Sequence, residues 1–124
     1  MFESAEIGHT LSKTEYNQRV PLIRQELLNL QQELREKKTF QVIILIGGVD
    51  GAGKSETVKI LNEWMDPLFI ETNEMGLTTK KESAHPPMWR FWRVLPPKGK
   101  TGIFFGSWYT QPIIERVYGL NAKA

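Results

Sequence analysis

The sequence predicts an α/β fold: a parallel sheet with flanking helices, preceded by an N-terminal helical segment. A dense β-branched run, Phe40–Ile46, leads into a glycine-rich turn and then into a segment with helical periodicity. Two further strand-like segments follow at Leu68–Thr72 and Thr101–Phe105, with helical patterns between and after them. Strands that alternate with helices are typical of a parallel sheet whose crossovers are right-handed.

Residues 1–38 are predicted to form the helical extension, and residues 39–124 the sheet-containing domain. Thr10 or Ser12 is expected to cap a short helix that begins over Thr10–Tyr16, and Pro21 to occupy the first turn of a second helix. This helix has an apolar face and is expected to end near Lys37–Lys38. The residues of that face are Val20, Ile23, Leu27, Leu30 and Leu34. Because the pattern is shorter than a coiled coil requires, we expect the leucines to dock on the core, with a dimer contact as the alternative.

Local sequence patterns predict the helices and strands of the sheet-containing domain, residues 39–124. Phe40–Ile46 is typical of a strand that is buried on both faces, and a helix is expected from about Lys54 to Met65, ending at Asp66-Pro67. Val58, Leu61 and Met65 share one face of that helix. The remaining expected elements are a strand at Leu68–Thr72, a polar loop at Asn73–His85, a short aromatic helix after Pro86-Pro87, a turn at Pro96–Gly99, a strand at Thr101–Phe105 and a helix at Gln111–Tyr118 with Pro112 in its first turn.

Composition narrows the class of protein. The chain has 124 residues and no cysteine, so disulfides and thiolate metal sites are excluded. The longest apolar run, Val42–Ile46, is far below the roughly 20 residues that span a bilayer, and the N-terminus lacks the order of a signal peptide. We therefore expect a cytoplasmic protein with no membrane partner and no specific nucleic-acid partner.

Positive charge is concentrated in one segment, although the net charge is only +2. The segment between Gly76 and Thr101 attracts anions such as phosphate chains, unless it is simply a solvated loop. Its cations are Lys80, Lys81, Arg90, Arg93, Lys98 and Lys100, and they are opposed only by Glu82.

The strongest motif lies at Gly48–Ser55, which satisfies the P-loop (Walker A) pattern G-x-x-x-x-G-K-[ST]. Its context fits, because the motif joins a predicted strand to a predicted helix. Phosphate oxygens must be met by several backbone N–H groups at once, which requires close approach and unusual dihedral angles. The predicted phosphate-binding residues are Gly48, Gly51, Ala52, Gly53, Lys54 and Ser55.

Within this loop the side chains have separate expected roles. Lys54 should bridge the terminal phosphates, and the Ser55 hydroxyl should bind Mg²⁺. Asp50 is less expected, because a carboxylate repels a phosphate ligand unless a metal intervenes. We therefore expect Asp50 to face Mg²⁺ or an acceptor group.

These residues, with two later motifs, resemble the family-2 polyphosphate kinases. The loop matches the family's G-x-D-x-x-G-K form, and the segments Arg90–Gly99 and Ser107–Val117 are similar to its arginine–aromatic helix and its S-W-Y segment. The opening residues and the Trp89–Arg93 segment look most like the N-terminal half of tandem-domain polyphosphate:AMP phosphotransferases. The resemblance spans essentially the whole chain.

The resemblance implies a P-loop kinase fold and phosphoryl transfer between inorganic polyphosphate and a nucleotide, AMP to ADP, with Mg²⁺. It implies that Asp50, Lys54 and Arg90 are catalytic groups, with Arg90 as a phosphate contact. Asp50 and Ser55 would hold the metal. The basic segment then has a natural partner in the polyphosphate anion.

The chain departs from the family pattern in two respects. Phe105 and Gly106 stand where the family has a metal-holding aspartate and an arginine, and Thr110 and Gln111 replace an asparagine and an arginine. We therefore expect a half that binds phosphate but catalyses poorly. Only about three strands are readable where a P-loop kinase has about five, so a fragment that partners a second kinase-like domain or a second copy is expected.

Two alternatives remain open at this point. One is an ordinary ATP-dependent P-loop kinase or NTPase, and the other is a non-catalytic module that binds phosphate and dimerises through its leucine face. Trp89, Phe91 and Trp92 are expected in the core, and packing is also the expected role of Trp108 and Tyr109. Neither His9 nor His85 has metal-ligand spacing, so no catalytic role is assigned to them.

Overall fold

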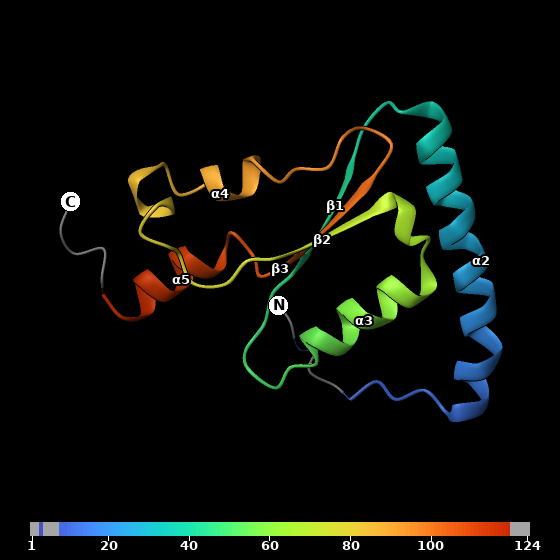
Figure 1. Ribbon diagram of the computed structural model, residues 1–124. Coiled ribbons are helices and arrows are strands. Elements are labelled where there is room, and N and C mark those ends of the chain that lie inside the picture. The colour runs from blue at the N-terminus through green and yellow to red at the C-terminus, as the bar shows by residue number, and fades with distance from the viewer. Residues whose placement is uncertain (1–2, 4–7, 120–124) are drawn as a thin grey trace.

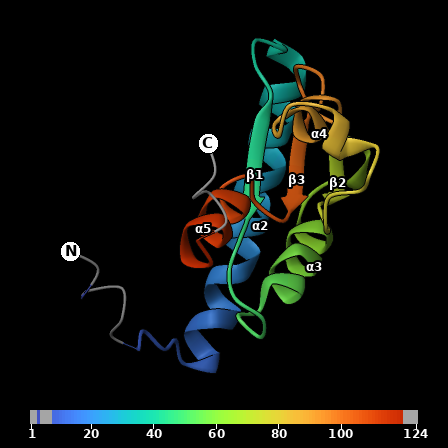
Figure 2. The ribbon, with the colours of Figure 1, turned by 90° about the vertical axis from the view of Figure 1, so that its left-hand side faces the viewer.

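A three-stranded parallel sheet forms the centre of the computed structural model, which describes Glu3 and residues 8–119. The strands are β1 (Val42–Ile46), β2 (Ile70–Glu74) and β3 (Thr101–Phe105), in the order β1-β3-β2. Figure 1 shows α2 and α3 on one side of the sheet and α4 and α5 on the other, and Figure 2 turns the sheet toward the viewer. The predicted α/β fold with a parallel sheet and an N-terminal helix is confirmed.

The buried strand is β3 rather than β1. Four consecutive residues of β3, Thr101–Phe104, are buried because β1 and β2 flank it on both sides. All five residues of β1 are only half-buried. The expectation that Phe40–Ile46 is buried on both faces was therefore wrong, since β1 is an edge of the sheet in the part of the chain that the structure describes.

One continuous helix, α2 (Lys13–Lys37), precedes the sheet. Ser12 caps it and forms a reciprocal capping box with Glu15, so of the two predicted caps Ser12 is the right one. Pro21 lies inside the helix, which corrects its expected place in a first turn. An interior proline removes a backbone hydrogen bond, and α2 accommodates that loss rather than breaking. The predicted end near Lys37–Lys38 is confirmed.

The apolar face of α2 docks on the core only in part. Leu27 packs against the core cluster of Met65, Ile70 and Ile103, whereas Leu30 is 61% exposed. Val58 and Leu61 of α3 (Lys54–Trp64) pack against the same cluster, as their spacing predicts. The core of this side of the sheet is therefore shared by α2, α3 and all three strands, since Ile44 and Ile46 of β1 also pack against the cluster.

The boundaries of the second strand differ from the prediction. Leu68 belongs to a short 3-10 turn, η1 (Pro67–Phe69), and β2 runs from Ile70 to Glu74. Asp66 starts this turn, because its carboxylate accepts a hydrogen bond from the Leu68 N–H at 3.0 Å. The polar loop after β2 contains a second 3-10 turn, η2 (Glu82–Ala84).

Aromatic side chains fill the other side of the sheet, under α4 (Trp89–Trp92) and the segment before α5 (Thr110–Val117). Phe91 is buried, with edge-on contacts to Phe104 and Trp108 at centroid distances of 6.0 Å and 5.7 Å. Trp92 is 58% exposed, so the core prediction holds for Phe91 and fails for Trp92. Tyr109, for which packing was expected, is also exposed. None of the helices in the described residues is both long and apolar enough to cross a bilayer.

Candidate functional site

The carboxyl ends of the three strands bring three segments together. The Gly106 N–H donates to the Ile46 carbonyl at 3.0 Å, and the Met75 N–H donates to the Phe105 carbonyl at 2.8 Å. These bonds hold side by side the glycine-rich loop (residues 47–53), the post-β2 loop (residues 75–85) and the post-β3 segment (residues 106–109). Ligands of open parallel sheets bind outside this edge.

The glycine-rich loop presents backbone N–H groups at the start of α3. Gly53 precedes the helix in the left-handed conformation, with a φ of 84°, and no side chain caps the helix. Every residue from Gly47 to Gly53 is exposed. The positive end of α3 is thus open to solvent, which is the arrangement that attracts an anion.

Lys54 lies over this loop. Its Nζ donates to the Gly48 carbonyl at 2.7 Å and lies 4.0 Å from the Asp50 carboxylate. The Lys54 side chain is 25% exposed, whereas that of Asp50 is fully exposed. An ammonium group has three N–H donors, so two remain available for an incoming phosphate oxygen.

Two oxygen donors here suit a hard divalent cation. The Ser55 hydroxyl is exposed on the first turn of α3, and the described residues offer it no hydrogen-bond partner. Asp50 supplies one carboxylate. Mg²⁺ is held by one or two carboxylates together with phosphate oxygens and water, so this pair fits the ion although no cluster of three or more His, Asp or Glu residues occurs in the described ranges.

The post-β3 segment offers no carboxylate at this edge. Phe105 is half-buried, and Gly106 has a φ of +117°. A Cβ atom added at Gly106 would lie 2.7 Å from the Met75 carbonyl oxygen, so any side chain at this position requires the post-β2 loop to move. The resemblance leads us to expect an arginine at position 106. The close backbone packing around Gly106 leaves no room for that side chain.

Arg90 lies against the post-β2 loop. Its Nη1 donates to the Thr78 Oγ1 at 3.0 Å and its Nη2 to the Gly76 carbonyl at 2.7 Å, while its Nε lies 3.6 Å from a Glu82 carboxylate oxygen. The structure therefore places the predicted Asp50 on the glycine-rich loop and Lys54 and Ser55 on the first turn of α3. Arg90 lies on α4, against the post-β2 loop. A phosphate contact for Arg90 stays a prediction.

Sequence reasoning overlooked one structural feature of the post-β2 loop. The Thr79 N–H donates to the Glu82 carboxylate at 2.8 Å, and the Glu82 N–H donates to the Thr79 Oγ1 at 3.3 Å. The signal was present, because T-x-x-E at residues 79–82 is a capping box. The bond from the Thr79 N–H holds the pKa of Glu82 below its usual value, helped by the Thr79 hydroxyl and by the charges of Arg90 and Arg93.

Comparison with known proteins shows to which family this chain belongs. A profile of the polyphosphate kinase 2 (PPK2) family matches residues 10–124. The chain belongs to this family. Two curated relatives are the polyphosphate:AMP phosphotransferases of Pseudomonas aeruginosa, 56% identical, and of Pseudomonas syringae pv. tomato, 53% identical. Each alignment covers 96% of this chain and 24% of the relative, so the chain spans about a quarter of their length.

Solved structures named polyphosphate kinase 2 share the fold. One, from Pseudomonas aeruginosa, is 55% identical with a TM-score of 0.89, and the match covers 97% of this chain and 26% of that one. Another, from Arthrobacter aurescens TC1, is 25% identical with a TM-score of 0.82, covering 92% and 42% respectively. The three-stranded sheet with its N-terminal helix is therefore a polyphosphate kinase 2 architecture.

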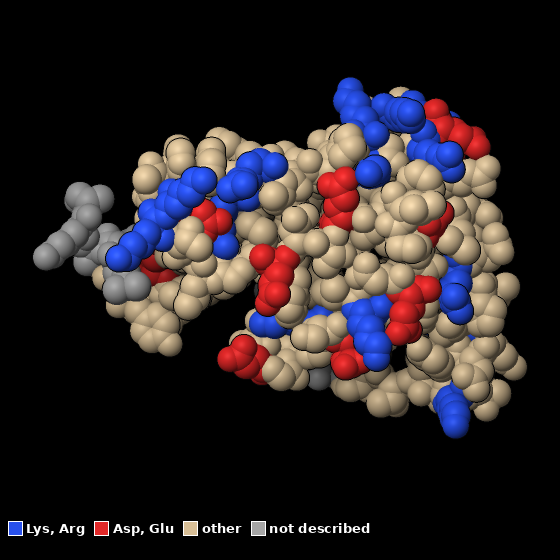
Figure 3. All heavy atoms as spheres, viewed as in Figure 1, with Lys and Arg blue, Asp and Glu red and all other residues tan. Residues whose placement is uncertain are grey.

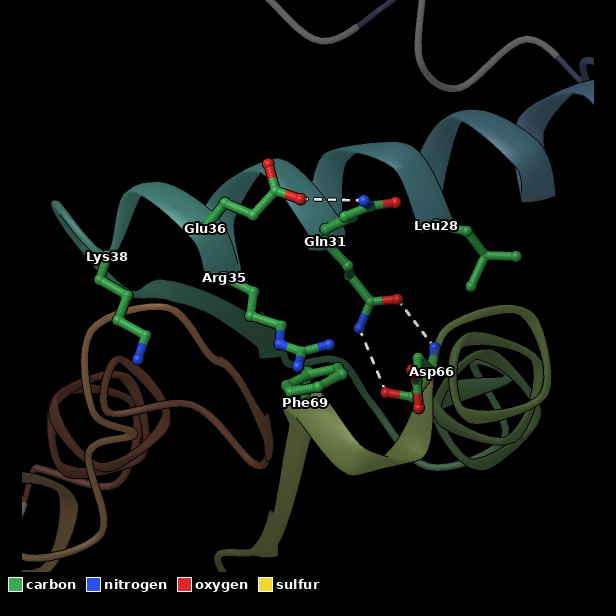
Figure 4. Close-up of a pocket in the computed structure, with 8 residues that line it drawn as sticks. Leu28, Gln31, Arg35, Glu36, Lys38, Asp66 and Phe69 are labelled. Atoms are coloured by element: carbon green, nitrogen blue, oxygen red, sulfur yellow. Dashed lines mark hydrogen bonds between the residues drawn. The ribbon is translucent and has the colours of Figure 1, made fainter.

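Two cavities lie away from the glycine-rich loop of this polyphosphate kinase 2 domain, both beside α2. One, of about 570 Å³, is drawn in Figure 4: Gln31 reaches Asp66 across it, and Arg35 lies 4.5 Å above the ring of Phe69. The other, of about 370 Å³, is largely apolar and lies between α2 and the sheet, at Leu27, Leu34 and Ile44. Gln31 and Asp66 of the first cavity already bond to each other, as do Gln32 and Glu36, so it is best explained by helix docking.

Proposed function

We propose that this chain supplies the phosphate-binding part of a polyphosphate-dependent nucleotide phosphotransferase, which moves a phosphoryl group between inorganic polyphosphate and a nucleotide and so converts AMP to ADP. The position of Lys54 over a glycine-rich loop, at the carboxyl edge of a parallel sheet, carries the proposal. Membership of the polyphosphate kinase 2 family and the names of the two Pseudomonas relatives support the substrates.

In this proposal the glycine-rich loop acts as a P-loop. Backbone N–H groups at the start of α3 meet the oxygens of the terminal phosphates, and the two N–H groups of Lys54 that are not bonded to Gly48 bridge neighbouring phosphates. Asp50 and Ser55 would hold Mg²⁺, which when bound neutralises charge on the phosphoryl oxygens.

The transfer itself is balanced by one bond made and one broken. A phosphate oxygen of AMP attacks the terminal phosphorus of polyphosphate, the bridging P–O bond to the next phosphate breaks, and ADP leaves with a polyphosphate one unit shorter. The protein contributes position and positive charge to such a reaction, because the phosphoryl group needs little covalent help.

We further infer that this chain binds phosphate but catalyses phosphoryl transfer poorly. Phe105 and Gly106 give the edge neither a second carboxylate nor a second cation from β3. A second kinase-like domain or a second copy of the chain would then supply turnover. The division at residue 38 and a cytoplasmic location stay predictions.

Calorimetric titration with tripolyphosphate and Mg²⁺ tests the phosphate site. We expect binding that Lys54→Ala abolishes and that Lys59→Ala leaves unchanged, since Lys59 is an exposed lysine on the same helix. Equal affinity of the wild type and Lys54→Ala would overturn the site. Incubation with AMP and polyphosphate should yield little ADP from this chain alone.

Two results would favour the other functions. Hydrolysis of ATP without polyphosphate would indicate an ordinary NTPase. A dimer that Ile23→Asp and Leu30→Asp dissociate, with phosphate binding unaffected by Lys54→Ala, would indicate an assembly module. Both residues belong to the apolar face of α2 and are exposed, at 41% and 61%.

A further inference from the structure

A connected set of hydrogen bonds and one ion pair joins the post-β2 loop to α4. Arg90 contacts the loop at three points, Gly76, Thr78 and Glu82. Glu82 in turn bonds reciprocally with Thr79. A single carboxylate therefore ties the capping box of the loop to the guanidinium group of α4.

The Arg90 guanidinium is turned into the protein. Its side chain is 13% exposed and that of Glu82 is 19% exposed, and the Nε atom is buried without a hydrogen-bond partner. A guanidinium that contacts a substrate phosphate directly must present its N–H groups to solvent. Arg90 instead uses two of its five N–H groups, one on each Nη atom, for Thr78 and Gly76 of its own chain.

The two residues between Thr79 and Glu82 have the opposite character. Lys80 and Lys81 are both exposed, and no carboxylate of the described residues pairs with either of them. Figure 3 shows Lys and Arg side chains gathered over the α4 part of the molecule. The capping box thus holds two unpaired cations at the surface of the post-β2 loop. Arg90 bonds to Gly76 and Thr78 of the same loop.

This loop adjoins the glycine-rich loop across the end of β3. The Gly106 N–H bonds to Ile46, and the Gly106 Cα packs against the Met75 carbonyl so closely that a Cβ atom has no room. These contacts involve Met75, the first residue of the post-β2 loop, and Lys80 and Lys81 follow five and six residues later. We expect a long polyanion whose terminal phosphates occupy the glycine-rich loop to extend past the end of β3 to this lysine-bearing surface. A mononucleotide is too short to contact both the glycine-rich loop and the lysines of the post-β2 loop.

We propose that Arg90 is a positioning residue and that the post-β2 loop, through Lys80 and Lys81, is the second contact of the polyphosphate chain. The choice of ligand rests on the proposed function. Arg90 acts through the loop that it holds, in place of the direct phosphate contact that the family resemblance implies.

Paired measurements on the full chain test this proposal: amide hydrogen exchange of residues 76–84, and the affinity for long-chain polyphosphate at two salt concentrations. Arg90→Lys keeps the charge but not the fork of two bonds, and Glu82→Gln weakens both the pairing and the cap. We expect each to speed exchange and to weaken polyphosphate binding by about tenfold, the effect of losing one charge-assisted hydrogen bond.

Variants of the two lysines should weaken polyphosphate binding without changing the structure of the loop. Lys80→Ala with Lys81→Ala should weaken polyphosphate binding by about tenfold and reduce its salt dependence, with exchange of the loop unchanged. Tripolyphosphate, which is short, should lose much less affinity. Lys59→Ala, which removes an exposed charge from α3, is the matched control and should change neither measurement.

Three outcomes would count against the proposal. If Arg90→Lys binds polyphosphate normally while Arg90→Ala does not, and exchange is the same in both, Arg90 is a direct charge contact. If the double lysine variant keeps full affinity, the loop is not a binding element. If the wild type binds no polyphosphate, the proposed function and the ligand of this loop both fail, while the exchange data still decide the role of Arg90.

Discussion

The side chain of Gln31, on α2, forms two hydrogen bonds with the backbone of Asp66, just beyond α3. Its Nε2 donates to the Asp66 carbonyl at 3.2 Å, and its Oε1 accepts from the Asp66 N–H at 2.8 Å. Gln31 is only 5% exposed and is the one buried residue of α2. A polar side chain therefore completes a docking surface to which Leu27 contributes by packing on the core, whereas Leu30 is 61% exposed.

Gln31→Leu should destabilise the chain by about 1–3 kcal/mol, because it leaves the N–H and the carbonyl of the half-buried Asp66 without these partners. Urea unfolding followed by circular dichroism measures the change. Gln32→Leu is the control: Gln32 is exposed and bonds only to Glu36, so we expect a change within about 0.5 kcal/mol. Similar losses in both variants would mean that the Gln31 bonds contribute nothing specific.

Gly106→Ala should destabilise by about 2–4 kcal/mol, since it adds a clash with the Met75 carbonyl at 2.7 Å to the cost of a positive φ. Gly51→Ala separates the two costs. Gly51 also has a positive φ, of +79°, but a Cβ atom added there would meet nothing within 4 Å, so only about 1 kcal/mol is expected. Thermal unfolding of the two variants gives the comparison, and equal values would contradict the close packing of the strand ends.

Ser12→Ala should cost about 1 kcal/mol, because it removes the hydroxyl that caps the Glu15 N–H. Thr10→Ala, at the other candidate cap, should have no measurable effect, since α2 begins at Lys13. Helix content and the midpoint of urea unfolding report both changes. The opposite order of the two variants would place the start of the helix upstream.

Acid should loosen the post-β2 loop. The hydrogen bond from the Thr79 N–H, followed by the Thr79 hydroxyl and the charges of Arg90 and Arg93, lowers the pKa of Glu82 below its ordinary value of 4.5. A lowered carboxyl pKa contributes stability that is fully present above the ordinary pKa and is lost as the pH falls through the pKa of the folded state.

The Thr79 amide resonance reports this titration directly by NMR. We expect it to shift with a midpoint below pH 4.5 in the wild type, and to show no such transition in Glu82→Gln. A transition that persists in Glu82→Gln would assign the titration to another carboxyl group.

Features encoded within a few residues could be predicted from the sequence. The glycine-rich loop between β1 and α3, the strand Thr101–Phe105 and the aromatic helix after Pro87 were all found by local pattern. The residues of the candidate site, Asp50 on that loop and Lys54 and Ser55 on the first turn of α3, belong to the same short motif. Hydrogen-bonding partners within a few residues, such as Ser12 and Glu15, have signatures of the same kind.

Only the tertiary structure decided which strand is central and which groups meet across the sheet. The dense apolar run of β1 lies at an edge while β3, with Gly102 within it, is buried, because strand order depends on pairing between segments far apart in the chain. The partners of Arg90 were hidden for the same reason: Gly76 and Thr78 lie 14 and 12 residues away and come within reach only when α4 packs beside the post-β2 loop. Local sequence determined the glycine-rich loop itself, and the packing of distant backbone segments determined what lies beside it.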